Sequence, residues 1–276
     1  MLILAATPIG NLSDASPRLV ECLQTANYIA AEDTRTLYKL AQALDIKISA
    51  KTYSLHEHNE GDRVEYLVKI ASEHDLVVVS DAGMPTVSDP GFQLVRGCVA
   101  ADVDVTIIPG PSAVLSALAV SGLPTDRFSF EGFVPRKQGE RQRLWETLAH
   151  ETRTMIFFES PHRILESLES ALSVLGADRR ATVSRELTKK FEQTVRGNLA
   201  ELVEWAKTEP KGEMVVVIAG AEATEHQAID VVDQVLQLVA AGSPLKPAVA
   251  EVADAAGVSK SELYDLVLKE RKARGQ

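Results

Sequence analysis

The stretch Ser80–Gly91, SDAGMPTVSDPG, decides the fold of this chain. It follows Leu76–Val79, a short apolar, β-branched run that is typical of a buried strand. It precedes Phe92–Ala101, where apolar residues recur at helical spacing, and we expect Asp89 to cap this helix with Pro90 in its first turn. Because open α/β sheets bind ligands at the carboxyl ends of their strands, this loop is the first candidate site.

The composition is typical of an ordinary globular protein with about two domains. The chain has 276 residues, of which 45% are hydrophobic and 25% are charged. Met1–Ala6 is too short to span a membrane and has no basic flank like that of a signal peptide, so we expect a cytoplasmic protein without membrane contact. A net charge of −10 argues against nucleic-acid binding over the whole surface but is compatible with a local basic patch.

Two further loops of similar character follow apolar strands in the first half of the chain. Leu2–Ala6 runs into TPIGN, and Val103–Ile108 runs into PGPSA. The alternation of strands and helices over residues 1–121 predicts a mainly parallel sheet with helices on both faces. The three loops would then share one edge of the sheet, where backbone N–H groups, small side chains and the carboxylate of Asp81 would line a cleft.

The rest of the chain is predicted to form a second α/β domain and a helical extension. The second domain covers residues 122–221 and begins after the turn sequence SGLP. A polar stretch then leads to residues 228–276, where three helices are expected at Ile229–Ala241, Pro247–Ala256 and Lys260–Lys272. The last two helices carry the Ala, Gly and Ser spacing of a helix-turn-helix.

Several familiar nucleotide, hydrolase and metal motifs are missing from the sequence. No G-x-G-x-x-G follows a strand, and no P-loop or G-x-S-x-G elbow occurs. Cys22 and Cys98 are isolated in helix-like stretches, and no zinc-binding pattern is found. We therefore expect neither a metal centre nor a disulfide.

A series of short motifs resembles the tetrapyrrole methylase superfamily. In chain order they are TPIGNL, EDTR, HEHNE, SDAGMPTVSDPG, PGPSA, SGLPTDRFSFEGFVPRK, ESPHR, RELTKKFE and KGEMVVV. They are most similar to its ribosomal RNA branch, the small-subunit ribosomal RNA (cytidine-2′-O)-methyltransferases. The resemblance covers residues 1–221 almost continuously, and the helical tail is also similar to that of this branch.

The resemblance implies an α/β, two-domain tetrapyrrole-methylase-like methyltransferase fold with a small C-terminal helix-turn-helix-like extension. It implies S-adenosylmethionine (SAM) as the cofactor, bound between the two domains. The expected reaction is methyl transfer to the ribose 2′-OH of a cytidine in small-subunit ribosomal RNA. The expected substrate form is an assembled or assembling ribosomal subunit, and the enzyme is expected to be a homodimer.

The resemblance also assigns cofactor-binding residues to both domains. These are Pro8, Asp81, Ala82, Gly83, Met84, Ser112, Ala113, Phe158, Leu187 and Met214. Such a set is chemically reasonable, because an adenine needs an apolar slot with backbone hydrogen bonds, and a methionine carboxylate needs N–H donors.

Polar residues in other loops are the candidates for binding the acceptor and removing its proton. His58 and Glu186 are the predicted catalytic residues. The predicted substrate-binding residues are His56, Asn59, Glu60, Arg136, Lys137, Arg141, Arg143 and Lys189. The basic cluster among them fits a phosphate-binding rim. All of these polar residues could also be part of an ordinary solvated surface. In that alternative, Glu186 forms an ion pair with Lys189, and Glu32 of the motif EDTR forms one with Arg35.

Two other classes of protein remain open. A methyltransferase of a tetrapyrrole or of a protein side chain would have the same cofactor cleft but would not need the basic loop or the tail. A non-enzymatic nucleic-acid-binding regulator would act through the helix-turn-helix and use the α/β part to sense a ligand. The acidic net charge disfavours this last class.

Overall fold

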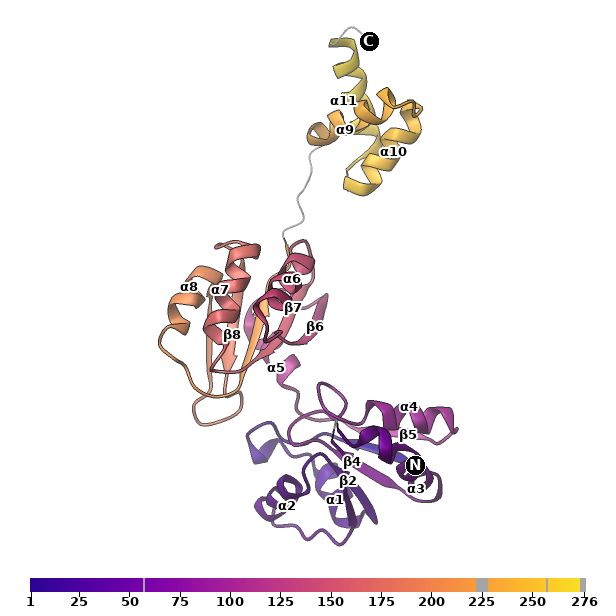
Figure 1. Ribbon diagram of the computed structural model, residues 1–276, viewed down its shortest axis with the longest axis vertical. Coiled ribbons are helices and arrows are strands. Elements are labelled where there is room, and N and C mark those ends of the chain that lie inside the picture. Colours follow the sequence, from indigo (N-terminus) through magenta and orange to yellow (C-terminus); the bar gives the residue numbers. More distant parts are fainter. Residues whose placement is uncertain (57, 222–227, 257, 274–276) are drawn as a thin grey trace. The chain divides into compact units, whose positions relative to one another are not determined.

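The computed structural model describes residues 1–56, 58–221, 228–256 and 258–273 (Figure 1). The chain divides into two compact units, Met1–Ala221 and Glu222–Gln276. The first unit contains two five-stranded sheets, and the described part of the second unit consists of helices. No helix within the described ranges is long and apolar enough to cross a membrane.

The first sheet is parallel throughout, in line with the mainly parallel sheet that the sequence predicts, and its strand order is β3-β2-β4-β1-β5. Its strands are β1 (Leu2–Ala5), β2 (Tyr28–Ala31), β3 (Lys51–Ser54), β4 (Leu76–Val79) and β5 (Val105–Ile108). Its helices are the short 3-10 helix η1 (Leu12–Asp14), α1 (Pro17–Thr25), α2 (Thr34–Ala43), α3 (Glu60–Glu73) and α4 (Phe92–Ala100).

Helices cover both faces of this sheet because side chains alternate along each buried strand. Leu76 and Val78 of β4 belong to a core cluster with the apolar residues of α3 and α4. Val77 and Val79 belong to a second cluster with those of α1 and α2. Since β4, β1 and β5 are neighbours, the three loops that follow them lie at one edge of the sheet, as predicted.

The second sheet is mixed and has the order β6-β7-β10-β8-β9. Only the β6–β7 pair is parallel. The strands are β6 (Phe128–Phe133), β7 (Thr154–Glu159), β8 (Arg180–Arg185), β9 (Gln193–Asn198) and β10 (Met214–Ile218). The helices associated with it are α5 (Ala113–Ser121), α6 (Gln138–Leu148), α7 (Ile164–Leu175) and α8 (Leu199–Ala206).

Helix α5, which the sequence assigns to the first domain, packs on the second sheet. Its residues Val114, Ala117 and Leu118 share a core cluster with Val215 and Val217 of β10. The opposite face of the sheet is covered by α6, α7 and α8. The loop after β5 therefore leads directly from one sheet to the helix that packs on the other.

Helix α4 begins differently from the prediction. Its N-cap is Gly91, at a left-handed φ of +118°, and not Asp89. The buried carboxylate of Glu60, the first residue of α3, accepts the backbone N–H groups of Gly91, Gln93 and Leu94 at 2.8–3.2 Å. A side chain from another helix thus satisfies the orphan N–H groups at the start of α4.

The second unit confirms the three predicted helices. A short 3-10 helix, η2 (Ala228–Val231), precedes α9 (Val232–Ala240), α10 (Leu245–Ala256) and α11 (Lys260–Ala273). They enclose a separate apolar core that includes Val235, Val249 and Leu263. Ser259 lies just before α11, and its Oγ accepts the N–H of Glu262 at 3.4 Å, as expected for a residue that caps this helix.

Candidate active site

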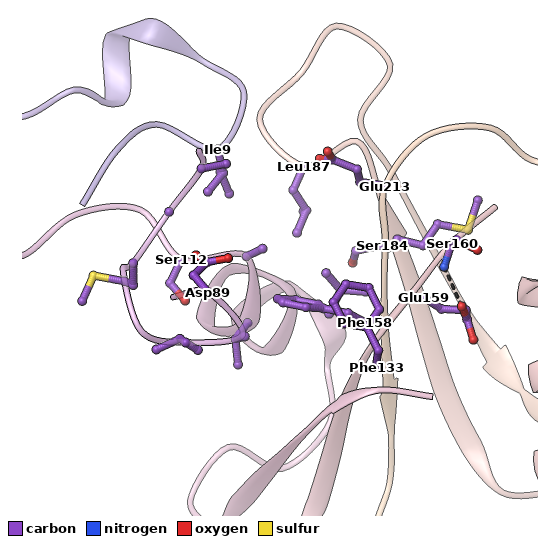
Figure 2. Close-up of a pocket in the computed structure, with 18 of the residues that line it drawn as sticks. Ile9, Asp89, Ser112, Phe133, Phe158, Glu159, Ser160, Ser184, Leu187 and Glu213 are labelled. Atoms are coloured by element: carbon purple, nitrogen blue, oxygen red, sulfur yellow. Dashed lines mark hydrogen bonds between the residues drawn. The ribbon is translucent and has the colours of Figure 1, made fainter. Parts of the chain in front are cut away.

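A pocket of the first unit lies where the three strand-end loops of the first sheet meet the second sheet. Its volume is about 310 Å³, and its lining is mainly apolar. Figure 2 shows Asp89 and Ser112 on one side of the pocket, facing Phe158, Ser184 and Glu213 on the other. A ligand in this pocket would contact both sheets.

Backbone hydrogen bonds hold the loops of the first sheet in a defined arrangement. Thr7 and Gly83 form an isolated antiparallel bridge, with N–O distances of 2.9 and 3.1 Å. Gly83 has a φ of +83°, and a Cβ at this position would lie 3.2 Å from Cγ2 of Ile9. The first two loops are therefore in close contact, and a larger residue than glycine would strain both the backbone and this contact.

Most of the predicted cofactor residues line the pocket. They are Ala82, Gly83, Met84, Ser112, Ala113, Phe158, Leu187 and Met214. Pro8 is buried beside the pocket, and the lining residue of its loop is the next one, Ile9. Asp81 is also absent from the lining, because its carboxylate points toward α2 and its Oδ1 accepts the backbone N–H of Asp33 at 3.1 Å.

The carboxylate that the loop Ser80–Gly91 contributes to the pocket is that of Asp89, which was expected to cap the following helix. Burial, with a further contribution from the negative charge of Glu32, raises the pKa of Asp89 from its ordinary value of 3.8 to about 7. Because Glu60 caps α4, the carboxylate of Asp89 is not needed for that purpose. A carboxylate with such a pKa exchanges a proton near neutral pH.

The sequence analysis also missed several lining residues of the second sheet. They include Phe133, Ser184 and Glu213. Phe133 is 59% exposed, and its ring packs edge-on to Phe158 with 5.4 Å between centroids. The aromatic residues of FSFEGF carry no sign that the last phenylalanine borders a pocket.

The motif ESPHR contributes one buried carboxylate, that of Glu159, to the second-sheet side of the pocket. The fully buried carboxylate of Glu159 accepts from Arg163 and Ser167, each at 2.5 Å. Arg163 also donates to the carbonyl of Val134 at 3.1 Å. Helix α7 starts only at Ile164, so Ser160 is not its N-cap. This network is structural and holds the backbone that leads into the basic loop.

The loop LHEHNE divides into an exposed part and a structural part. His56 and His58 are exposed, and their rings pack edge-on with 6.1 Å between centroids. Asn59 closes the turn, since its Oδ1 accepts the N–H of His56 and its Nδ2 donates to the carbonyl of Ser54. Glu60 was predicted to bind substrate, but its burial and its role at α4 exclude direct contact in this structure.

Glu186 and Lys189 form an ion pair, as the alternative interpretation of the sequence allowed. Lys189 Nζ lies 3.0 Å from Glu186 Oε1 and 2.8 Å from Glu213 Oε2. The hydrogen bond from Lys189 lowers the pKa of Glu186. Glu186 Oε1 also accepts the backbone N–H of Glu213 at 3.1 Å. These contacts make Glu186 a weaker proton acceptor than the sequence suggested.

The basic cluster is only partly on the surface. Arg136, Lys137 and Arg143 are exposed, and Lys137 pairs with Glu140 at 2.9 Å. Arg141 is 5% exposed and donates to the carbonyl of Arg136 and to Glu166. The prediction that Arg141 contacts substrate is therefore wrong for this structure: it braces the loop that presents the other three.

The remaining charged groups near the first sheet have other partners than expected. Arg35 pairs with Asp33 at 2.6 Å, whereas Glu32 accepts the backbone N–H of Asp81 at 3.2 Å. The predicted pair between Glu32 and Arg35 is thus replaced by two separate contacts. Among the residues that the structure describes, no group of three or more His, Cys, Asp or Glu side chains is placed to hold a metal ion.

Known proteins match both units of the chain. The family of tetrapyrrole (corrin/porphyrin) methylases matches residues 1–203, and the RsmI C-terminal HTH domain matches residues 225–272. A Mycobacterium tuberculosis (strain CDC 1551 / Oshkosh) protein named ribosomal RNA small subunit methyltransferase I is 49% identical, over 99% of this chain and 96% of its own. Its namesake from Escherichia coli O157:H7 is 42% identical, over 98% and 95%.

Solved structures agree on the fold. The methyltransferase CobJ superposes with a TM-score of 0.60 at 19% sequence identity, covering 80% of this chain and 94% of its own. The match to the tetrapyrrole methylases and to relatives named ribosomal RNA small subunit methyltransferase I makes this chain a methyltransferase. The chain belongs to the tetrapyrrole methylase family.

Proposed function

We propose that this methyltransferase transfers a methyl group from SAM to the ribose 2′-hydroxyl of a cytidine in small-subunit ribosomal RNA. The observation that carries the proposal is the near full-length match to proteins named ribosomal RNA small subunit methyltransferase I. The match to these relatives includes the C-terminal helical unit. The match to the structure of CobJ, in contrast, covers 80% of the chain. The expected cytidine 2′-O specificity rests on the motifs shared with the ribosomal RNA branch.

The pocket has the chemistry that SAM requires. Phe158, Leu187 and Met214 offer an apolar surface for the adenine ring. Asp89 and Glu213 supply negative charge for a ligand that carries a positive sulfonium and ammonium. Bound SAM supplies an electrophilic methyl carbon, and the departing sulfur keeps the electron pair of the broken bond as a neutral thioether. The chain must then orient the ribose oxygen in line and accept its proton.

Asp89 is the best-supported acceptor for that proton. It lines the pocket, and its raised pKa of about 7 is close to neutral pH, where a general base is most effective. Glu186 is held by Lys189 and by a backbone N–H, which favours a structural role. His58 is exposed on the loop after β3 and does not line the pocket, so we propose it for substrate contact together with His56.

The exposed residues Arg136, Lys137 and Arg143 support RNA binding next to the pocket. Arg136 and Lys137 follow the pocket-lining Phe133 by three and four residues, so phosphates bound there would lie near the reacting nucleotide. The helix-turn-helix of the second unit is proposed as an additional RNA contact. Such a substrate implies action in the cytoplasm, on a ribosomal subunit.

We also propose that the enzyme is a homodimer. The edge strand β5 exposes Val105 and Ile107, and α4 exposes 65% of Val99. Exposed apolar side chains along an edge strand are costly for a monomer and favourable in an interface. Analytical ultracentrifugation tests this proposal, since a monomer at micromolar concentration would contradict it.

The substrate proposal is tested by incubating the purified protein with methyl-labelled SAM and with separated small or large ribosomal subunits. We expect label in the RNA of the small subunit and none in the large subunit. Label in ribosomal protein would indicate a side-chain methyltransferase. Transfer to a tetrapyrrole, with no transfer to either subunit, would contradict the proposal.

A further inference from the structure

The loop Glu186–Glu192 presents an exposed aromatic side chain close to the pocket. Its residue Leu187 lines the pocket and extends into it in Figure 2. Four residues later, Phe191 is 64% exposed. A four-residue segment spans at most about 14 Å, so Phe191 lies within that distance of the pocket wall. A large exposed aromatic at such a place requires an explanation, because burial would be more favourable.

Hydrogen bonds hold this loop in a strained conformation. Glu186 and Thr188 have φ values of +51° and +67°, which are unfavourable for residues other than glycine. Thr188 donates its N–H to Glu192 at 2.6 Å, and its Oγ1 accepts the N–H of Asn11 at 3.1 Å. The loop is thus pinned to the first strand-end loop of the other sheet. Strain that is maintained by so many contacts is typical of functional segments.

The loop also packs tightly against glycine residues on either side. A Cβ on Gly10 would lie 2.4 Å from Cγ of Lys189, and a Cβ on Gly212 would lie 2.3 Å from Cγ of Glu186. Neither position accommodates a side chain unless the side chain of Lys189 or Glu186 moves. Together with the hydrogen bonds of Thr188, this packing holds the backbone that carries Phe191 in place, so little conformational entropy would be lost if a ligand bound there.

The surroundings of Phe191 suit a nucleic acid. Lys190 is exposed, and its Nζ lies 5.6 Å from the centroid of the Phe191 ring. An aromatic ring beside a cation matches the pattern by which proteins bind single-stranded nucleic acids, with a base on the ring and a phosphate on the cation. A purely apolar protein partner would gain nothing from the lysine.

We infer, on the basis of the proposed function, that the loop Glu186–Glu192 is an RNA-binding element. Phe191 stacks on a base next to the target nucleotide, on the ring face away from Lys190, and Lys190 contacts a phosphate. The element would hold the RNA strand at the mouth of the pocket while the target ribose enters it. Phe191 and Lys190 act on RNA positioning and leave the binding of SAM unchanged, whereas Leu187 of the same loop faces the pocket.

The test compares Phe191→Ala, Phe191→Leu and Phe191→Tyr with the unchanged protein in methylation of small ribosomal subunits. We expect Ala and Leu to raise the KM for subunits roughly 5- to 150-fold, which is the range of base–aromatic stacking at 1.4 kcal/mol per tenfold. Tyr should retain a KM close to that of the unchanged protein, because it keeps the ring. SAM affinity by calorimetry should be equal for all variants.

The chain offers a control in Tyr38→Ala. Tyr38, on α2, is 48% exposed and does not line the pocket. Its KM should not change. If Phe191→Ala leaves the KM unchanged, or if Leu substitutes as well as Tyr does, the stacking assignment is wrong.

Two further results separate this inference from its alternatives. A lowered oligomeric state of Phe191→Ala in ultracentrifugation would assign the ring to a protein interface and overturn the inference. If the unchanged protein does not methylate small subunits at all, the proposed function fails, independently of Phe191. Lys190→Gln should flatten the salt dependence of RNA binding by about 0.7 units of slope, as for one contact to a single strand.

Discussion

Asp89 and Asp81 belong to the same loop but lie in different environments. Asp89 lines the pocket, and burial raises its pKa to about 7. Asp81 accepts the backbone N–H of Asp33 outside the pocket. The role of each carboxylate depends on contacts with residues far away in the sequence. Asp89 is therefore a candidate proton acceptor because the folded chain buries it in the pocket, and its sequence position alone does not indicate this.

Replacing Asp89 with Asn tests its role as proton acceptor. A carboxyl group accepts a proton only when ionised, so kcat of the unchanged enzyme should rise as the pH increases through about 7. Asp89→Asn should lower kcat about 10²–10⁴-fold and remove this rise. The control is Asp104→Asn, an exposed aspartate outside the pocket lining. An unchanged kcat in Asp89→Asn would assign proton removal to another group.

The same substitution has an effect on stability with a defined sign. Because folding raises the pKa of Asp89, the folded state binds its proton more tightly than the unfolded state does. The stabilisation from this group is complete below its ordinary pKa of 3.8 and is lost as the pH rises through about 7. At pH 8, Asp89→Asn should therefore have a higher midpoint of urea unfolding than the unchanged protein. A lower midpoint would contradict the burial argument.

At the scale of single elements, helix α4 depends on a cap from another helix. Glu60→Gln keeps one acceptor oxygen but removes the negative charge at the N-terminus of α4. We expect the free energy of unfolding to fall by about 1–2 kcal/mol, as measured by urea denaturation. Glu65→Gln, at an exposed position of the same helix α3, should have almost no effect. Equal effects of the two substitutions would contradict the capping role.

The basic residues at and before the start of α6 are expected to affect RNA binding without affecting SAM binding. Replacing Arg136, Lys137 and Arg143 with Gln should weaken RNA binding and flatten its salt dependence by roughly one unit of slope, or slightly less, per lost contact. SAM affinity should stay the same. Arg141→Gln should instead reduce stability, because its guanidinium is buried and braces the loop. An unchanged salt slope in the triple variant would leave these residues as a solvated surface.

The sequence predicts some elements well and others poorly, for physical reasons. The continuous apolar run of β4 predicts a strand buried on both faces, and its two faces contact different helix pairs. Strand β9, QTVRGN, has no such signal, because it is a polar edge strand that pairs only with β8. The cap of α4 could not be predicted either, since it depends on Glu60, which lies in a separate helix.

The candidate site shows the same division. The loops TPIGN, SDAGMP and PGPSA could be located because parallel strands bring their carboxyl ends to one edge. Phe133, Ser184 and Glu213 could not, because they line the pocket only once the second sheet meets those loops. Arg141 was misplaced for a similar reason, since its burial depends on packing against α7 and not on local charge.

At the scale of the whole molecule, the second unit has its own apolar core. A variant that ends at Ala221 should therefore remain folded and bind SAM with unchanged affinity in calorimetry. If the helix-turn-helix contacts RNA, methylation of small subunits should fall, with a higher KM for subunits. Loss of cooperative thermal unfolding in the shortened protein would show that the first unit needs the helices in order to fold.

The central claim concerns the atom that receives the methyl group. The most direct test is to methylate unmodified small subunits with labelled SAM, digest their RNA to nucleosides, and identify the labelled nucleoside by chromatography and mass spectrometry. Our account predicts that the label is found in 2′-O-methylcytidine, and that Asp89→Asn reduces its rate of formation. Label in a cytidine methylated on the base, or in any other nucleoside, would contradict the account.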